Sequence, residues 1–135
     1  MNFNFKFFGN VEFGPGSISK LKEILNNNRL SKVVLVIDQN LLELPIIIKL
    51  IDDIKELTSD TVICDISEPT YDSLEIKRLS IKEKVVDSFI GIGGGSALDM
   101  AKGLSVLQTN KGPAISYRGF NMFSSEPLPI IAIPT

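Results

Sequence analysis

Residues 89–102 read FIGIGGGSALDMAK: an apolar run, a cluster of glycines and a helical pattern, one directly after another. Gly93, Gly94 and Gly95 carry no Cβ atom, so a phosphate could approach the backbone amides at the positive end of the following helix. The segment therefore predicts a strand, a turn and a helix with a phosphate site at the turn. A tight turn that binds nothing is the alternative interpretation.

The two common nucleotide fingerprints do not match this turn. Both GxGxxG and GxxxxGK[ST] need a glycine at the position that Ser96 occupies. The segment is therefore either a nucleotide-binding loop of another kind or a turn that binds nothing.

The rest of the chain alternates apolar runs with helical patterns, which is typical of a parallel sheet. Four runs are apolar at nearly every position and predict strands covered on both faces: 33–37, 62–66, 89–92 and 130–133. The stretches between them predict helices at 17–26, 43–57, 72–86 and 96–109. Residues 3–8 and 11–13 alternate like a short β pair. We expect an α/β fold, with a mostly parallel sheet and helices on both faces.

Several residues are suited to the ends of these helices. Ser17 is a candidate N-cap, Pro45 fits a first turn, and Asp72 with Glu75 has capping-box spacing. The asparagines at 26–28 can supply a terminal residue with positive φ.

Composition bounds the class of protein. The chain has 135 residues, enough for one domain, and a formal net charge of −2, which predicts no affinity for nucleic acid or an anionic membrane. Its N-terminus lacks the pattern of a secretion signal, and its longest apolar run, near residues 45–50, is far short of the roughly 20 residues of a membrane span. The single cysteine, Cys64, predicts a buried structural thiol in a reducing compartment such as the cytoplasm.

Asp38 follows the strand predicted at 33–37. A carboxylate at a strand end can accept hydrogen bonds from both ribose hydroxyls of an adenosine and would repel a 2′-phosphate. In an ordinary dinucleotide fold this acid follows the glycine loop, whereas here it precedes it. A turn-forming aspartate is the alternative.

Taken together, these residues resemble the iron-containing alcohol dehydrogenase family, whose fold is shared with glycerol dehydrogenases and dehydroquinate synthase. The resemblance covers nearly the whole chain: FGPGS at 13–17, VID at 36–38, EPT at 68–70, GGGSxxDxAK at 93–102 and PIIAIPT at 129–135. It implies a Rossmann-like, dinucleotide-binding N-terminal domain over residues 1–135.

The resemblance also implies roles for individual residues. Asp38 would hold the adenine ribose and favour NAD over NADP. Gly94, Gly95 and Ser96 would cradle the pyrophosphate in the same cofactor site as Gly93, and Asp99 would help to order the loop. Thr135 matches the first threonine of a segment that closes over the cofactor. Arg118, in a stretch similar to the family's Tyr-Arg-Gly, is interpreted as a solvated surface arginine.

The metal of the family, Fe²⁺ or Zn²⁺, is by this resemblance bound in a helical C-terminal domain by an aspartate and histidines. This chain has no histidine, and its acids at 52, 53, 60 and 65 show no metal-ligand spacing. We therefore expect no metal ligand and no catalytic residue here, and an NAD-binding piece of an alcohol or aldehyde oxidoreductase that is inactive alone. A homodimer through an edge strand with Phe3, Phe5, Phe7 and Phe8 is a further expectation.

Two alternatives stay open. The chain could be the cofactor domain of a glycerol or polyol dehydrogenase or of a dehydroquinate synthase-like enzyme, although Ser96 stands where the glycerol dehydrogenases commonly have lysine. A receiver-type phosphoacceptor domain would fit the run VLVID at 34–38, but Gln39 replaces the expected second acid and no Lys-Pro pair occurs.

Overall fold

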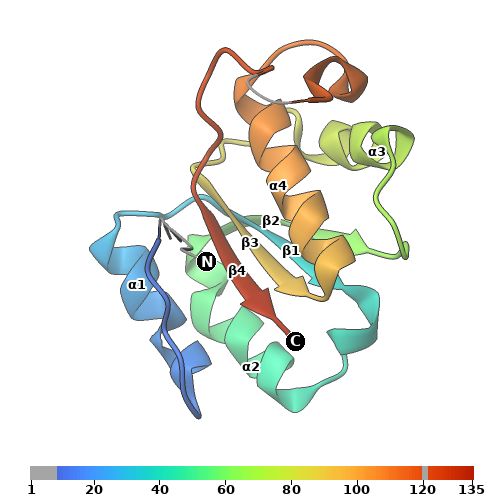
Figure 1. Ribbon diagram of the computed structural model, residues 1–135. Coiled ribbons are helices and arrows are strands. Elements are labelled where there is room, and N and C mark those ends of the chain that lie inside the picture. Colours follow the sequence, from blue (N-terminus) through green and yellow to red (C-terminus); the bar gives the residue numbers. More distant parts are fainter. Residues whose placement is uncertain (1–8, 120–121) are drawn as a thin grey trace, which may run out of the picture.

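A computed structural model describes residues 9–119 and 122–135 of the chain. Its sheet has four strands in the order β2-β1-β3-β4, and every neighbouring pair is parallel (Figure 1). The strands are β1 (Val33–Asp38), β2 (Thr58–Cys64), β3 (Ser88–Gly93) and β4 (Ile130–Pro134). The predicted α/β fold with a parallel sheet is thus confirmed.

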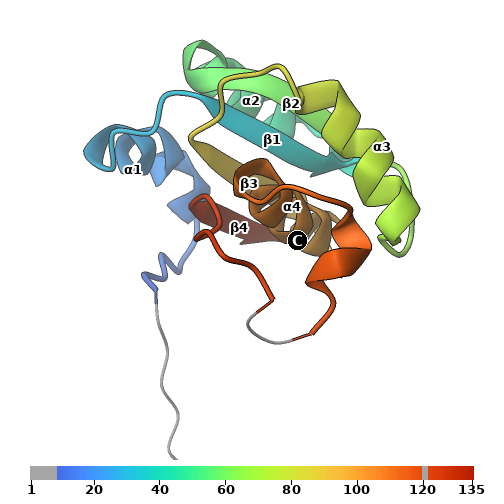
Figure 2. The same cartoon turned by 90° about the horizontal axis from the view of Figure 1, so that it is seen from above.

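Helices cover both faces of this sheet, also as predicted (Figure 2). The α-helices are α1 (Leu21–Asn27), α2 (Pro45–Ile54), α3 (Tyr71–Ile81) and α4 (Gly95–Thr109). Four 3₁₀ turns accompany them: η1 (Ser17–Lys20), η2 (Gln39–Leu41), η3 (Lys55–Leu57) and η4 (Ala114–Tyr117). In the described part of the chain, no helix combines the length and apolar character needed to cross a membrane.

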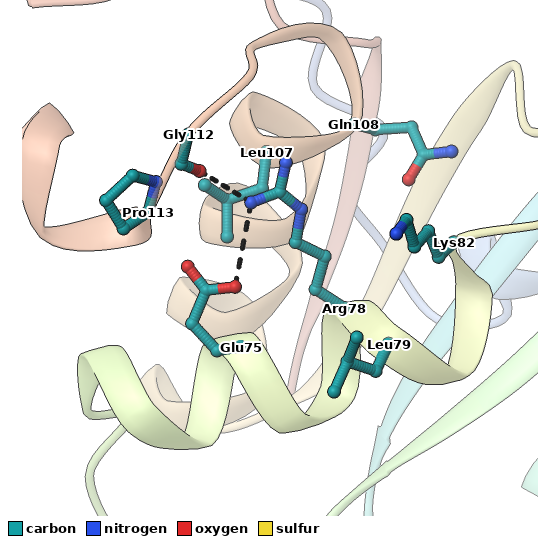
Figure 3. A pocket seen from close by; sticks show the side chains of 8 residues that line it. All are labelled: Glu75, Arg78, Leu79, Lys82, Leu107, Gln108, Gly112 and Pro113. Atoms are coloured by element: carbon teal, nitrogen blue, oxygen red, sulfur yellow. Dashed lines mark hydrogen bonds and ion pairs between the residues drawn. The ribbon is translucent and has the colours of Figure 1, made fainter.

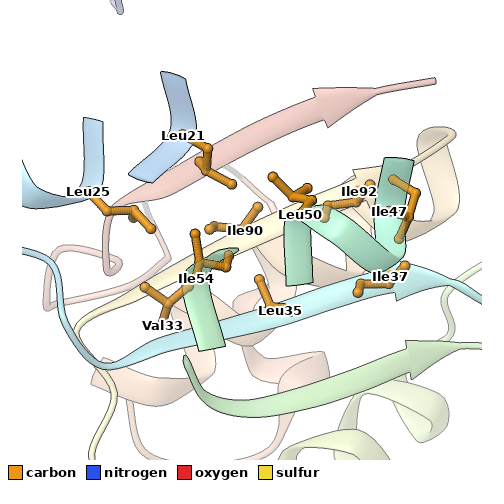
Figure 4. Packing of buried hydrophobic residues seen from close by; sticks show 10 residues of the cluster. All are labelled: Leu21, Leu25, Val33, Leu35, Ile37, Ile47, Leu50, Ile54, Ile90 and Ile92. Carbon is orange, nitrogen blue, oxygen red and sulfur yellow. The ribbon is translucent and has the colours of Figure 1, made fainter. Parts of the chain in front are cut away.

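Two apolar clusters hold the layers together, one on each face. On the first face, α1 and α2 pack against β1 and β3 through ten buried side chains (Figure 4): Leu21, Leu25, Val33, Leu35, Ile37, Ile47, Leu50, Ile54, Ile90 and Ile92. On the second face, α3 and α4 pack on the alternate positions of the same strands, among them Val34, Val36 and Phe89. Successive residues of a strand point to opposite faces, so a strand covered twice must be apolar throughout.

Strand β2 lies earlier than the predicted 62–66. It begins at Thr58 and ends at Cys64, and its first residues, Thr58 to Thr61, are polar. Within the described residues β2 is an edge strand that pairs only with β1, and polar side chains are tolerated at the edge of a sheet. An apolar pattern therefore underestimates its extent.

The helix ends also differ from expectation. Pro45 stands in the first turn of α2 as predicted. Gly16, not Ser17, precedes the first 3₁₀ turn with a left-handed backbone of φ 77°. The positive φ after α1 belongs to Arg29 (φ 57°) and not to residues 26–28.

The start of α3 was predicted at Asp72 and lies at Tyr71. Its capping box joins Thr70 and Ser73, each side chain accepting a hydrogen bond from the other's backbone N–H. Glu75 is not part of the box, because its carboxylate accepts a hydrogen bond from the backbone N–H of Ala114 at 2.6 Å.

The predicted N-terminal β pair is not confirmed. Residues 11–13 form no strand. Residues 3–8, with the phenylalanines of the expected dimer edge, lie outside the described residues.

Candidate cofactor site

The sheet reverses its order between β1 and β3. From β1 the chain moves to β2 on one side and then to β3 on the other, and in such sheets ligands bind outside the carboxyl ends of the strands at this switch point. Asp38 ends β1 and Gly93 ends β3. Thr135 follows β4, and its backbone N–H donates to the Gly93 carbonyl at 3.1 Å. The carboxyl ends of β1, β3 and β4 lie at one edge of the sheet (Figure 1), so the predicted site residues at these ends lie at that edge.

Gly93 is required by its surroundings. Its φ is 144°, a conformation that side-chain-bearing residues rarely adopt. An added Cβ would lie 2.8 Å from the Cβ of Asp38 and 3.0 Å from that of Ala97. The missing side chain lets β1 and the start of α4 close around the end of β3.

Gly94 and Gly95 are different, because a Cβ on either would meet nothing within 4 Å. They border open space at the start of α4. The N-cap residue of this 15-residue helix, Gly94, has no side chain to cap it, and the first turn holds no acid. Its first backbone N–H groups and the positive end of its dipole thus suit an anion such as a pyrophosphate.

Asp38 is half-buried, and one of its carboxylate oxygens is already engaged. Oδ1 accepts hydrogen bonds from the backbone N–H and the side-chain amide of Asn40, both at 2.9 Å. Asp38 thereby caps η2, as the turn-forming interpretation requires. Among the described residues no hydrogen bond to Oδ2 is formed, so a ribose hydroxyl could still bind there. Sequence reasoning missed Asn40, because an asparagine after a strand reads only as turn chemistry.

Ser96 and Asp99 have protein partners. The Ser96 hydroxyl donates to the carbonyl of Ser67 and so ties the loop after β2 to the glycine turn. Asp99 forms an exposed ion pair with Lys102 at 3.2 Å. A role for either residue in cofactor binding stays a prediction.

Two of the other acids, Asp52 and Asp65, form surface ion pairs. Asp52 pairs with Lys55 at 2.8 Å, and the hydrogen bond from that ammonium lowers the pKa of Asp52. Asp65 pairs with Lys77 at 3.0 Å. Within residues 9–119 and 122–135, no group of three or more histidine, cysteine or acidic side chains is arranged to hold a metal ion.

Two further predictions concern single side chains. Cys64 is buried, and burial raises the pKa of its thiol, as expected for a structural cysteine. Arg118 is exposed, in keeping with a solvated surface arginine.

A pocket lies elsewhere, between the C-terminal parts of α3 and α4 (Figure 3). Arg78 crosses it and donates to the carbonyls of Gly112, at 2.7 Å, and Asn110, at 3.2 Å. Its guanidinium also lies 3.6 Å from Glu75. Because Arg78 is engaged with the backbone after α4, this pocket is better explained as the join between two elements than as a binding site.

Comparisons with known proteins point to one family. The family model described as "Iron-containing alcohol dehydrogenase" matches residues 9–135. Alcohol dehydrogenase 4 of Schizosaccharomyces pombe is 30% identical over 129 residues, 91% of this chain and 30% of that protein. Sulfoacetaldehyde reductase of Bilophila wadsworthia is 46% identical over 68 residues, 50% of this chain and 18% of that protein.

A solved structure shows the same fold. Sulfoacetaldehyde reductase from Bifidobacterium kashiwanohense, in complex with NAD⁺, superposes with a TM-score of 0.87 at 21% identity and covers 99% of this chain and 36% of that one. The chain thus spans about a third or less of the length of these relatives.

Proposed function

The chain belongs to the iron-containing alcohol dehydrogenase family, and from that premise we propose that residues 1–135 form the NAD-binding domain of a metal-dependent alcohol dehydrogenase. One observation carries the proposal: an aspartate with one carboxylate oxygen that no described residue binds and a helix start whose N-cap is a glycine meet at the switch point of a parallel sheet. A ribose hydroxyl and a pyrophosphate are the groups that such a pair suits.

We assign a role in cofactor binding to each of the predicted site residues. Asp38 would accept a hydrogen bond from a hydroxyl group of the adenosine ribose. Gly94 and Gly95 would let the pyrophosphate reach the N–H groups of α4, while Gly93 keeps the turn closed and Ser96 holds the loop after β2 beside it. Thr135, bonded to Gly93, would begin the segment that covers the cofactor. Asp99 would act further along α4, with Lys102 as its partner.

The reaction we propose for the whole enzyme is hydride transfer between NAD and an alcohol or aldehyde. The family's divalent metal would polarise the substrate oxygen. Neither the metal nor the substrate contacts are assigned to this chain, which has no histidine. We therefore expect the isolated chain to be inactive. A cytoplasmic location and a homodimer remain proposals from the sequence.

A second candidate within the same fold is a glycerol or polyol dehydrogenase. Ser96 argues against it, because members of that branch commonly have lysine at this position, whereas the Ser96 hydroxyl of this chain donates to the Ser67 carbonyl. The match to sulfoacetaldehyde reductases keeps aldehydes among the candidate substrates.

Calorimetric titration of the purified chain with NAD and, separately, with NADP tests the proposal. We expect NAD to bind and NADP to bind more weakly, and Asp38→Gly to weaken NAD binding. Asp53→Asn, on the exposed side of α2, is the matched control and should bind NAD as the wild type does. If the folded chain binds neither dinucleotide, residues 1–135 do not form a working cofactor site and the proposal fails.

A further inference from the structure

Asn40 donates two hydrogen bonds to the Asp38 carboxylate, one more than the cap of η2 requires. A cap of η2 needs only the bond from the backbone N–H of Asn40 to Oδ1. The side-chain amide of the same residue donates a second bond to the same oxygen, also at 2.9 Å. Two donors on one oxygen fix the rotation of the carboxyl group, so the other oxygen is the one left for a ligand.

The opposite side of Asp38 is held by packing. Its Cβ lies against the bare Cα of Gly93, where an added Cβ would come within 2.8 Å. In the sheet, the preceding residues Ile37 and Ile92 are directly paired. Asp38 therefore rests over the glycine turn and has little freedom to move away from it.

Asp38 forms no ion pair with a cation of residues 9–119 or 122–135. The ion pairs of the described residues involve other acids. Neutral donors on Oδ1 leave most of the negative charge on the pair of oxygens. A hydroxyl group can donate to such a carboxylate, whereas a phosphate with a charge of about −1.5 to −2 is repelled by it.

We propose that Asn40 is a positioning residue that determines cofactor specificity: its side-chain amide orients Asp38 so that one carboxylate oxygen is reserved for the adenosine 2′-hydroxyl of NAD. The proposal rests on the proposed NAD binding and goes beyond it by assigning a second residue to the choice between NAD and NADP. Asn40 itself need not touch the cofactor.

The test compares three ligands: NAD, NADP and the NAD analogue that lacks the adenosine 2′-hydroxyl. Their affinities are measured by calorimetry for the full chain and for Asn40→Ala, which keeps the backbone bond of the cap. We expect Asn40→Ala to weaken NAD binding about 3- to 10-fold, as for loss of one hydrogen bond. Binding of the deoxy analogue should not change, and the preference for NAD over NADP should shrink by the same factor.

Two controls separate positioning from folding. Asn27→Ala removes an exposed asparagine at the end of α1, at the amino edge of the sheet, and should change no affinity. In the Asp38→Ala background, Asn40→Ala should have no further effect, because the group that it positions is gone.

The outcomes decide the two proposals separately. An equal loss for NAD and the deoxy analogue on Asn40→Ala would overturn the role of Asn40 and leave NAD binding intact. The same holds if the wild type binds NAD and the deoxy analogue equally well. A wild-type chain that binds no dinucleotide overturns both.

Discussion

Gly93 and Gly94 are neighbours in one turn, but a side chain would have a different effect at each position. Gly93 has φ 144° and no room for a Cβ, whereas Gly94 has φ −77° and open space around it. We expect Gly93→Ala to lower the free energy of unfolding by about 2–4 kcal/mol, through backbone strain and overpacking. Urea unfolding followed by circular dichroism measures the loss.

Gly94→Ala is the matched partner of that change. Its backbone is one that alanine adopts freely, so the stability should stay within about 0.5 kcal/mol of wild type. The new methyl would instead occupy the space proposed for the pyrophosphate, so NAD binding should weaken. If Gly94→Ala bound NAD as tightly as wild type, the pyrophosphate would have to lie elsewhere.

The buried thiol of Cys64 should make the stability of the chain depend on pH at alkaline pH. Burial raises the pKa of its thiol above the ordinary value of 9.0, so the folded chain holds this proton more tightly than the unfolded chain does. The contribution to stability is complete below the ordinary pKa and is lost as the pH rises past it. A disulfide reagent such as Ellman's should therefore react slowly with the native chain at pH 8 and quickly in urea. Rapid reaction of the native chain would contradict the burial.

The sequence predicts those site residues whose chemical type and position relative to a strand or turn are both visible in it. Asp38 and the glycines were identified because a strand end and a run of glycines are visible in the sequence. Asn40 was not, because its role depends on where its amide points, and an exposed asparagine after a strand has many local uses. The bond of Ser96 to Ser67 joins residues 29 positions apart, and no local pattern reveals such a pair.

At the scale of elements, the segment that returns from α4 to β4 is held by a buried asparagine. Asn110 is 4% exposed. Its amide donates to the carbonyls of Val106 and Ser125, and its oxygen accepts from the backbone N–H groups of Ser124 and Ser125. Asn110 thus holds residues 124 and 125, and the Ser105 hydroxyl, which donates to the Leu128 carbonyl, holds the same segment closer to β4.

We expect Asn110→Ala to destabilise the chain by about 2–3 kcal/mol, because several hydrogen bonds of one buried side chain are lost at once. Asn28→Ala removes a single exposed bond to Ile24 and should cost less than about 1 kcal/mol. Both are measured by urea unfolding. Equal losses would mean that water replaces the contacts of Asn110.

The elements themselves were predicted with uneven success. The apolar runs of β1, β3 and β4 and the stripe of α2 located those elements within a few residues, because burial on two faces or one stripe leaves a clear pattern. β2 began four residues before its predicted start, since an edge strand needs no apolar ladder. The cap of α3 was missed because Thr70 and Ser73 do not form the usual Ser/Thr-x-x-Glu pair.

At the scale of the whole molecule, the glycine turn and the pocket of Arg78 lie at opposite ends of helix α4. The glycine turn lies at the carboxyl edge of the sheet, whereas the pocket of Arg78 lies between the far ends of α3 and α4 (Figures 1 and 3). Helix α4 has 15 residues and rises about 1.5 Å per residue, so its two ends are about 20 Å apart.

Hydrogen exchange with bound NAD distinguishes these regions. We expect NAD to slow amide exchange at residues 39–41, 67–70 and 94–97, which surround the switch point, and to leave residues 75–82 and 107–113 unchanged. A bound dinucleotide accepts hydrogen bonds from the free N–H groups of the first turn of α4 and restrains the loops beside it. Asp38→Gly, measured at the same NAD concentration, should reduce this protection in proportion to its lost affinity. Protection confined to residues 75–82 and 107–113 would place the cofactor in the pocket of Arg78 and refute the site at the carboxyl edge.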